Sequence, residues 1–288
     1  MPMNPRLLRP LASGVHPEAA AWRTAVVGAG GSVSASTMKA VSKFCADIDA
    51  AGIRSKFRRL NLFCGNSDSA LIAVRTPLYR GESRTGTQYG NTIDTNAGGN
   101  FQQGDYAENS GLTGDGSSTK YLDTGFNVDQ LPGAADCHIS AYIRGTQDIA
   151  SVRTLIGTLF NGITDRYRLF VSTSTAGNYQ LRGDLGKNTS EASAVRANSN
   201  GGLLVASRTS TTSLTLYDDA VSVNTNTTLT AETTGAVPFF VFARNGPTEF
   251  YNGIMAGYSI GAGMSLQDVT SYYNALNTFQ TALGRAQS

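Results

Sequence analysis

Between residues 121 and 260, short apolar stretches alternate with clusters of glycine, asparagine, serine and threonine. Nine stretches carry the period of two that is typical of half-buried strands, and we find no apolar pattern of helical period between them. The expected strands are residues 121–126, 138–144, 153–159, 167–172, 179–184, 203–208, 213–217, 239–244 and 254–260. Short strands that follow one another without helices predict a mainly β chain, folded as an antiparallel β-sandwich.

Composition agrees with short strands joined by turns. Of the 288 residues, 15% are charged, 40% are hydrophobic and 32 residues are glycine. This length suits one large β domain, or a sandwich joined to a smaller helical piece. No apolar run reaches the roughly 18 residues that span a bilayer, so we expect no membrane contact. The three cysteines, Cys45, Cys64 and Cys137, are odd in number and widely spaced, which predicts buried free thiols.

The N-terminal region has prolines and a helical apolar pattern in place of the strand pattern of the rest of the chain. Prolines at positions 2, 5 and 10 predict an irregular arm over residues 1–16. A short helix is expected over residues 17–27. A clearer helix is expected after Ser36, where apolar residues recur at intervals of three and four up to Gly52. The sequence therefore predicts an arm and two helices ahead of the strands.

One more helix is expected near the C-terminus. Ser265 is placed to cap it, and Asp268 stands three positions later, as in a capping box. Apolar residues then line one face until Gly284 ends the helix.

Charge is divided unevenly along the chain. Residues 1–80 hold 11 Lys and Arg against 4 Asp and Glu, whereas residues 81–288 hold 12 against 17. Within the basic part, "RSKFRRLNLF" at residues 54–63 has the period of a helix or a strand, with its apolar residues toward a core. Its basic residues are then solvated: Arg54, Lys56, Arg58 and Arg59. We expect this region to dock to protein, and no nucleic-acid binding.

Two segments resemble a known family. "TGDGSSTKYLDTGF" at residues 113–126 reads as a glycine-rich turn that opens a strand, with Leu122, Thr124 and Phe126 on one face. Together with "AGYSIGAGMSLQDVTSYYNALNTFQTALGR" at residues 256–285, it resembles the concanavalin A-like (laminin G-like) jelly rolls in virion proteins of tailed bacteriophages. The resemblance covers most of residues 36–285. It implies a tail-fibre, head-spike or capsid decoration protein, often oligomeric, with a helical piece before the jelly roll.

No constellation of catalytic residues is apparent. The closely spaced carboxylates of glucanases with this fold are missing, and Asp218 and Asp219 suit the turn of a hairpin better than catalysis. His16 and His138 lack companions at zinc-binding spacing. We therefore expect no enzymatic activity, with a glycan hydrolase kept as an alternative.

Two kinds of binding site remain as candidates. Calcium is a candidate cofactor at Asp105, Asp115 and Asp123, although Asp-Gly is itself a turn signal. A sugar needs aromatic rings to stack on and polar groups beside them. The candidate glycan-binding residues are Tyr167, Tyr179, Arg182, Tyr217, Tyr251 and Asn252, with Asn178 beside them.

The sequence thus predicts a virion structural protein made in the host cytoplasm. Residues 1–65 form an arm and a helical anchoring region, and residues 66–288 form the jelly roll. The expected partners are other virion proteins, reached through the N-terminal region, further copies of the chain, and host surface polysaccharide. The alternative is a decoration or cement protein that stabilises the particle without binding glycan.

Overall fold

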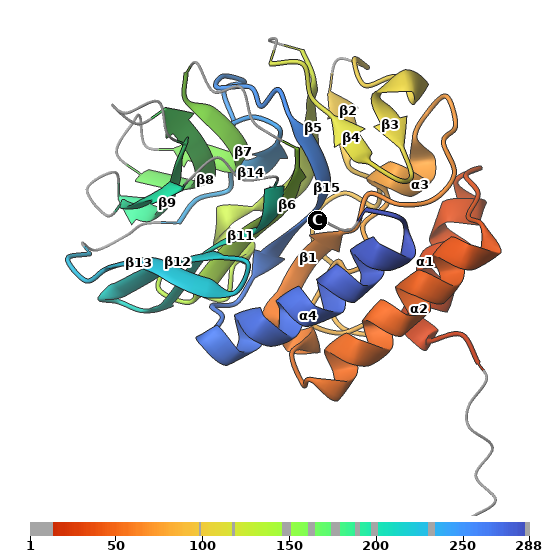
Figure 1. Cartoon of the computed structure of the whole chain (residues 1–288), viewed down its shortest axis with the longest axis horizontal. Coiled ribbons are helices and arrows are strands. Elements are labelled where there is room, and N and C mark those ends of the chain that lie inside the picture. The colour runs from red at the N-terminus through yellow and green to blue at the C-terminus, as the bar shows by residue number, and fades with distance from the viewer. Residues whose placement is uncertain are drawn as a thin grey trace, which may run out of the picture.

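The computed structural model describes residues 14–97, 99–116, 119–145, 151–160, 165–173, 179–187, 191–196, 201–229 and 234–285. Two antiparallel sheets form a sandwich, as the sequence predicts (Figure 1). Sheet A has the order β13-β12-β11-β6-β15-β4-β3, and β1 also pairs with β15. Its strands are β1 Phe57–Asn61, β3 Tyr106–Ala107, β4 Gly111–Thr113, β6 Cys137–Arg144, β11 Gly201–Ser210, β12 Ser213–Asp218, β13 Val221–Asn226 and β15 Ile254–Gly261.

Sheet B packs on sheet A and has the order β10-β9-β8-β7-β14-β5-β2. Its strands are β2 Thr95–Ala97, β5 Tyr121–Asn127, β7 Arg153–Phe160, β8 Asp165–Thr173, β9 Tyr179–Lys187, β10 Ala192–Arg196 and β14 Pro238–Val241. Alternate residues of both sheets fill the core between them. In β5, Leu122, Thr124 and Phe126 are buried, which confirms the predicted face of that strand.

Helices cover the other face of sheet A. They are α1 Pro17–Gly28, α2 Ala35–Ala50 and α4 Leu266–Ala282, with the short α3 Ile72–Arg75 and the 3-10 turns η2 Arg54–Lys56, η3 Gln103–Asp105 and η4 Val128–Gln130. α4 and α2 run side by side across the sheet in Figure 1. The ring of Tyr272 in α4 packs edge-on against Phe44 in α2 and Phe57 in β1, with centroids 6.4 and 4.9 Å away. Buried residues of these helices and of the adjoining face of sheet A form a second hydrophobic core. We call it the second core, and it holds the helical layer on the sheet. Among the described residues, no helix is long and apolar enough to cross a membrane.

The predicted helix signals are confirmed at the C-terminal helix and shifted at α2. Ser265 and Asp268 form the capping box of α4, and Gly284 follows the helix with φ of 72°. At α2 the N-cap is Ser34, whose side chain accepts from the Thr37 N–H at 3.1 Å. Ser36 lies in the first turn instead, because the helix starts one residue before it.

The nine predicted strands are all present, with ends that differ by up to three residues. The hairpin between β12 and β13 turns at Asp219 and Ala220, with φ of 46° and 66°, rather than at Asp218 and Asp219. Asp218 is the last residue of β12. Positive φ at both central residues is the type I′ geometry that suits a two-residue hairpin.

The boundary predicted at residue 65 does not coincide with a break in the packing. β1 lies before it and pairs with β15, with Leu60 opposite Ser259. Buried residues of α1 and α2, such as Trp22 and Phe44, share a core with Tyr142 and Leu203 of sheet A. The helical layer and the sandwich are therefore packed together over an extensive apolar surface.

Candidate functional site

The outer face of sheet B carries no helix of the described chain, because α1, α2 and α4 pack on sheet A. Residues paired across antiparallel strands share a face. One row runs over five strands, from Asp123 through Phe240, Gly157 and Arg168 to Asp184. The missing side chain at Gly157 matters, because a Cβ there would lie 3.2 Å from the Cβ of Arg168. Gly157 thus lets Arg168 lie close to the sheet.

Arg168 is the centre of a charged group on this face. Its Nε donates to Oδ2 of Asp184 at 2.8 Å, and its Nη1 donates to Oε2 of Glu249 at 2.9 Å. The Thr154 hydroxyl also donates to Oε2 of Glu249, at 2.7 Å. Arg244 lies on the other side, with Nε 3.6 Å from Oε1 of Glu249. The two arginines and two carboxylates balance in charge.

An aromatic ring separates Arg168 from a second ion pair. The guanidinium carbon of Arg168 lies 3.9 Å from the centroid of the Phe170 ring, and that of Arg182 lies 5.0 Å from it. Arg182 pairs with Glu191, with Nη2 and Oε1 2.5 Å apart. We call Arg168, Phe170, Arg182, Asp184, Glu191 and Glu249 the outer-face cluster. Phe170, Arg168 and Asp184 are buried, so Arg182 and Glu191 are the members of its second ion pair that present directional donors and acceptors at the surface.

Asp184 is the electrostatically unusual member of the outer-face cluster. Its side chain is fully buried, and Oδ1 has no hydrogen-bond partner in the described ranges. Burial raises the pKa of Asp184 to about 6, against the lowering effect of Arg168. A carboxyl group of this kind takes up a proton in mildly acidic solution.

The sequence-predicted glycan residues occupy different places. The rings of Tyr167, Tyr179, Tyr217 and Tyr251 are buried, so they offer no exposed surface for a sugar. Tyr167, for example, packs in the core between the sheets, with its ring stacked on Phe160 at 6.1 Å. Arg182 lies in the outer-face cluster, Asn252 is half-buried, and Asn178 lies outside the described residues. Alternating hydrophobicity located the strands without showing which tyrosines face the core.

The three aspartates named for calcium do not converge. Lys120 lies between two of them, with Nζ 2.8 Å from Asp105 Oδ1 and 3.6 Å from Asp115 Oδ2. The carboxylate of Asp123 instead accepts from the Gly125 N–H at 2.8 Å, which closes a local turn. In the described part of the chain, no three or more His, Cys, Asp or Glu side chains are grouped as metal ligands. The ammonium of Lys120 neutralises the first two carboxylates.

The sequence prediction overlooked a G-x-S-x-G order at residues 257–261. Its serine, Ser259, does contact a histidine, since its Oγ lies 2.8 Å from Nε2 of His138. Both side chains are fully buried in sheet A, and the other ring nitrogen of His138 lies 2.6 Å from the Ala262 carbonyl oxygen. Burial lowers the pKa of His138 to about 4. The motif lies within β15 rather than at an exposed strand-to-helix turn, which is where a nucleophilic serine is presented.

The two glycines of this motif have a packing role. A Cβ on Gly257 would lie 2.9 Å from the carbonyl oxygen of Asn61, and a Cβ on Gly261 would lie 1.9 Å from that of Lys56. The contact at Gly257 would be tight. The contact at Gly261 would be a steric overlap that forces the backbone at Lys56 to move. Glycine is therefore required where β1 and the turn before it lie closely against β15.

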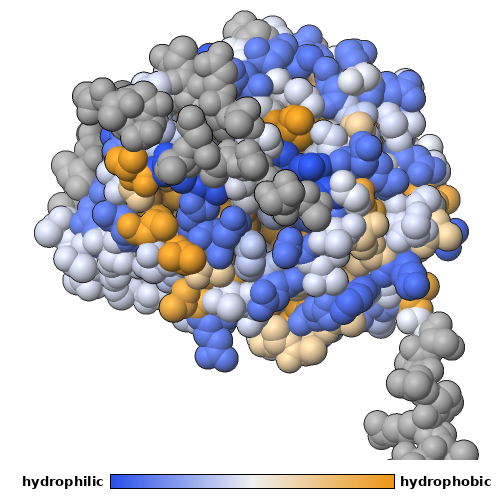
Figure 2. Space-filling view, viewed as in Figure 1, coloured by the Kyte–Doolittle hydropathy of each residue, from blue (hydrophilic) through white to orange (hydrophobic). Residues whose placement is uncertain are grey.

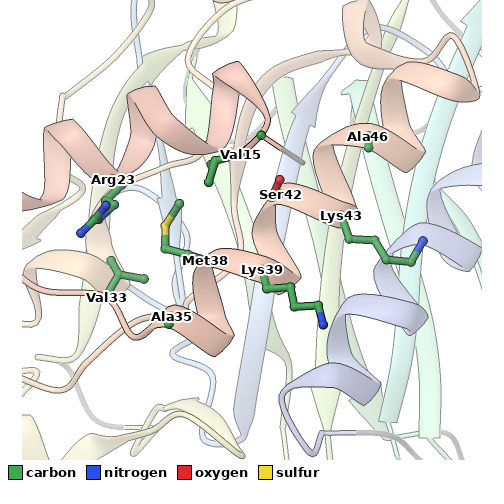
Figure 3. Close-up of a pocket in the computed structure, with 10 residues that line it drawn as sticks. Val15, Arg23, Val33, Ala35, Met38, Lys39, Ser42, Lys43 and Ala46 are labelled. Atoms are coloured by element: carbon green, nitrogen blue, oxygen red, sulfur yellow. The ribbon is translucent and has the colours of Figure 1, made fainter. Parts of the chain in front are cut away.

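A groove of about 640 Å³ lies between α1 and α2 (Figure 3). Val15, Val33 and Met38 contribute apolar surface to it, and Arg23 and Lys39 contribute positive charge. Lys43, also at the groove, pairs with Asp47 on the same helix at 2.9 Å. α1 also exposes an apolar side chain beside the polar Arg23 and Thr24, since Val27 is 55% exposed. Exposed apolar side chains next to an apolar groove are typical of a contact with another chain.

A second apolar surface lies at the edge of the sandwich. Val195 in β10 is 63% exposed and Val221 in β13 is 62% exposed, and these edge strands of the two sheets lie near each other. Figure 2 shows hydrophobic residues reaching the surface at the left, on the side of β9, β12 and β13. β13 has no charged residue and no proline to discourage pairing with another strand.

Comparison with protein-family models and with curated proteins gave no match. Among solved structures, the chain is similar to the binding domain of botulinum neurotoxin DC in complex with SialylT, with a TM-score of 0.41 and 11% identity, over 57% of this chain and 41% of that one. It is also similar to the NanB sialidase from Streptococcus pneumoniae, with a TM-score of 0.41 and 14% identity, over 55% of this chain and 26% of that one. The matched region thus covers less than half of each neighbour's own chain. Similarity at this level carries no inference about a ligand or an activity.

Proposed function

We propose that this chain is a bacteriophage virion structural protein that binds host surface polysaccharide through the outer face of sheet B. The sequence resemblance supports the virion role. The observation that carries the binding role is the arrangement of the layers: helices cover sheet A and leave the face that holds the outer-face cluster without a helical cover.

The chemistry of the outer-face cluster suits a sugar. Polysaccharides present many hydroxyl groups, which pair with donors and acceptors held at fixed positions. Arg182 and Glu191 keep 30% and 21% of their side chains exposed, so both are accessible. Because each is already paired with an opposite charge, the site favours neutral hydroxyls over a strongly charged ligand. Phe170 holds the two arginines apart and in place.

Calorimetric titration with purified host polysaccharide tests this proposal. We expect Arg182→Ala to weaken binding by about tenfold or more, because it removes charge-assisted donors worth about 1.5–3 kcal/mol. Lys39→Ala, which removes an exposed cation on α2, is the matched control and keeps the wild-type affinity. Equal affinity of both variants, or no binding by the wild-type protein, contradicts a glycan site on sheet B.

We propose that this binding is not accompanied by hydrolysis. The support is that Asp184 and Glu249 both bond to the guanidinium of Arg168, so neither carboxyl group is free to act alone. Incubation with the same polysaccharide is expected to release no reducing ends. Release that disappears in Asp184→Asn would establish an enzyme instead.

The groove between α1 and α2 supports docking to another virion protein, which is also the basis of the cement-protein alternative. Its cations suit an acidic apolar segment. Lys39→Glu combined with Lys43→Glu is expected to reduce incorporation into particles, while Arg182→Ala incorporates normally. If the charge-reversed protein incorporates fully, the groove is not the docking surface. Incorporation without any polysaccharide binding favours the cement role.

A further inference from the structure

A second, smaller cavity lies on the other side of α1 from the groove. It has a volume of about 140 Å³ and lies between α1 and the segment 76–92. Three arginines line it, Arg54, Arg80 and Arg84, and Glu18 is the one acidic residue in its lining. Trp22 fixes the wall formed by α1, because its indole N–H donates to the Thr76 carbonyl oxygen at 2.9 Å.

Arg54 is neutralised and held rigidly. Its Nε donates to Glu18 at 3.1 Å, and its Nη1 donates to the Gly81 carbonyl oxygen at 2.8 Å. The guanidinium carbon lies 3.7 Å from the centroid of the Tyr79 ring. Such a group is pre-oriented, so it loses little entropy when its remaining N–H groups meet a ligand.

Within the part of the chain that the structure describes, Arg80 and Arg84 form no ion pair with a carboxylate. Arg80 donates from Nη2 to the Gly90 carbonyl oxygen at 2.7 Å, and its Nε is buried with no hydrogen-bond partner among the described residues. The guanidinium of Arg84 is exposed and makes no hydrogen bond or ion pair with the described residues. The cavity therefore has two positive charges that the surrounding chain does not balance.

The surroundings make this excess charge unfavourable. Burial lowers the pKa of Arg80, and the positive charge of nearby Arg59 lowers it further, with Asp94 acting in the opposite direction. A buried N–H without an acceptor adds a cost of its own. An anion in the cavity would offset the excess positive charge of Arg80 and Arg84.

We propose that this cavity, the arginine pocket, is a binding site for a tetrahedral dianion, either sulfate or phosphate. Two uncompensated guanidinium groups match two negative charges. The forked N–H groups of arginine suit oxyanions that accept several hydrogen bonds at once. Since a water molecule takes about 30 Å³, the volume accommodates such an ion with part of its hydration. The site is separate from sheet B and does not depend on the polysaccharide proposal.

Calorimetric titration of the full chain tests the arginine pocket. The probes are sodium sulfate and sodium phosphate at constant ionic strength, with sodium acetate as a planar monoanion. Calorimetry is preferred to a melting temperature, because sulfate stabilises folded proteins without binding them. We expect saturable binding of one dianion per chain, weaker binding of acetate, and at least about a tenfold loss of affinity in Arg84→Ala.

Matched variants make the result decisive. Arg23→Ala removes another exposed charge, from α1 outside the arginine pocket, so it is expected to keep the wild-type affinity for sulfate. Arg80→Lys retains the charge but replaces the forked guanidinium by an ammonium, and is expected to bind sulfate more weakly than wild type. Absence of saturable binding, or equal losses in Arg84→Ala and Arg23→Ala, overturns the proposal.

The source of the anion follows from one more titration. Glucose 6-phosphate carries the same group on a larger molecule. One outcome is that glucose 6-phosphate binds at least as tightly as inorganic phosphate, with Arg84→Ala lowering the affinity for both compounds. In that case the arginine pocket binds a phosphate group carried by a larger ligand. If inorganic phosphate alone binds, the pocket holds a free ion. Both outcomes support a site for a dianion.

Discussion

At the scale of single residues, the buried charges of this protein are held by specific partners. Arg59 and Asp94 are fully buried, and the guanidinium and the carboxylate bond to each other. Tyr258 donates to both oxygens of Asp94, at 2.9 and 2.8 Å, and Asn61 donates to Oδ2 at 2.9 Å. The pair is therefore surrounded by hydrogen bonds, as a buried ion pair requires.

Removal of one partner from this network is predicted to be costly. Arg59→Leu leaves the Asp94 carboxylate buried without its counter-charge, which destabilises a protein by about 3–5 kcal/mol. The free energy of unfolding from urea titrations measures the change. Arg23→Leu, at an exposed position, is the control and is expected to shift stability by less than about 0.5 kcal/mol. A cost below about 1 kcal/mol for Arg59→Leu would contradict the role given to the network.

The same residue shows why the sequence prediction of solvated cations was wrong in part. "RSKFRRLNLF" places four basic residues among apolar ones, and the prediction assigned all four to solvent, Arg59 included. Its partner Asp94 stands 35 residues later in a stretch without regular periodicity. A local pattern carries no information about such a partner. Sequence reasoning therefore located the strand-forming region and missed the charge inside it.

Asp184 gives the protein a predicted dependence on pH. Its pKa in the folded protein is about 6, above the ordinary value of about 3.9 for the unfolded chain. The folded state therefore binds this proton more tightly, and the stability that results is complete below about pH 4 and lost as pH rises through about 6.

Comparison of wild type with Asp184→Asn isolates this effect. We expect wild-type stability to fall relative to the variant between pH 4 and 7, on the order of 2–3 kcal/mol. Denaturant unfolding at several pH values measures the difference. Asp129→Asn, at an exposed carboxylate, is expected to show no such trend. A constant difference between wild type and Asp184→Asn across this range would refute the assignment.

At the scale of elements, the long and regular segments follow from their sequence, and the short ones do not. α4 has a capping box and a continuous apolar face, so both its ends were predictable. β2, β3 and β4 have two or three residues each, which is too short for a period to be recognised. β10 lies in a stretch rich in alanine and serine, where neither strand face is strongly apolar. The outer-face cluster could not be predicted, because it depends on the register between strands.

The close pairing of β1 with β15 gives a prediction at this scale. In Gly261→Ala, the new methyl group would overlap the Lys56 carbonyl oxygen, and β1 must move away from its partner. We expect a loss of about 1–3 kcal/mol, the range for overpacking in a closely packed interior. Thermal and urea unfolding report it. Gly28→Ala, where a Cβ would meet nothing within 4 Å, is the control and is expected to be neutral or slightly stabilising.

At the scale of the whole molecule, the helical layer and the sandwich depend on each other. Deletion of residues 1–65 removes α1, α2 and β1, and leaves the outer surface of sheet A without most of its cover. We expect residues 66–288 alone to be insoluble or to lack a cooperative unfolding transition. Near-ultraviolet circular dichroism and urea titration of the fragment test this. A fragment that unfolds cooperatively would support residue 65 as a boundary between independent domains.

This dependence affects how docking is tested in the whole protein. Since truncation is expected to unfold the chain, loss of incorporation by a fragment does not locate a docking surface. Substitutions at exposed positions, such as Lys39 and Lys43, leave the second core intact and are the better test.

The pairing of β1 with β15 also concerns the synthesis of the protein. Arg59 and Tyr258, which bond to each other across these strands, are separated by 199 residues. At about 5–20 residues per second, the ribosome needs on the order of 10–40 s to make the intervening chain. During that interval β1 lacks its partner strand, and α1 and α2 lack α4 and sheet A. The nascent chain therefore presents apolar helices before their cover exists, so its yield in cells is expected to depend on chaperones that bind such segments.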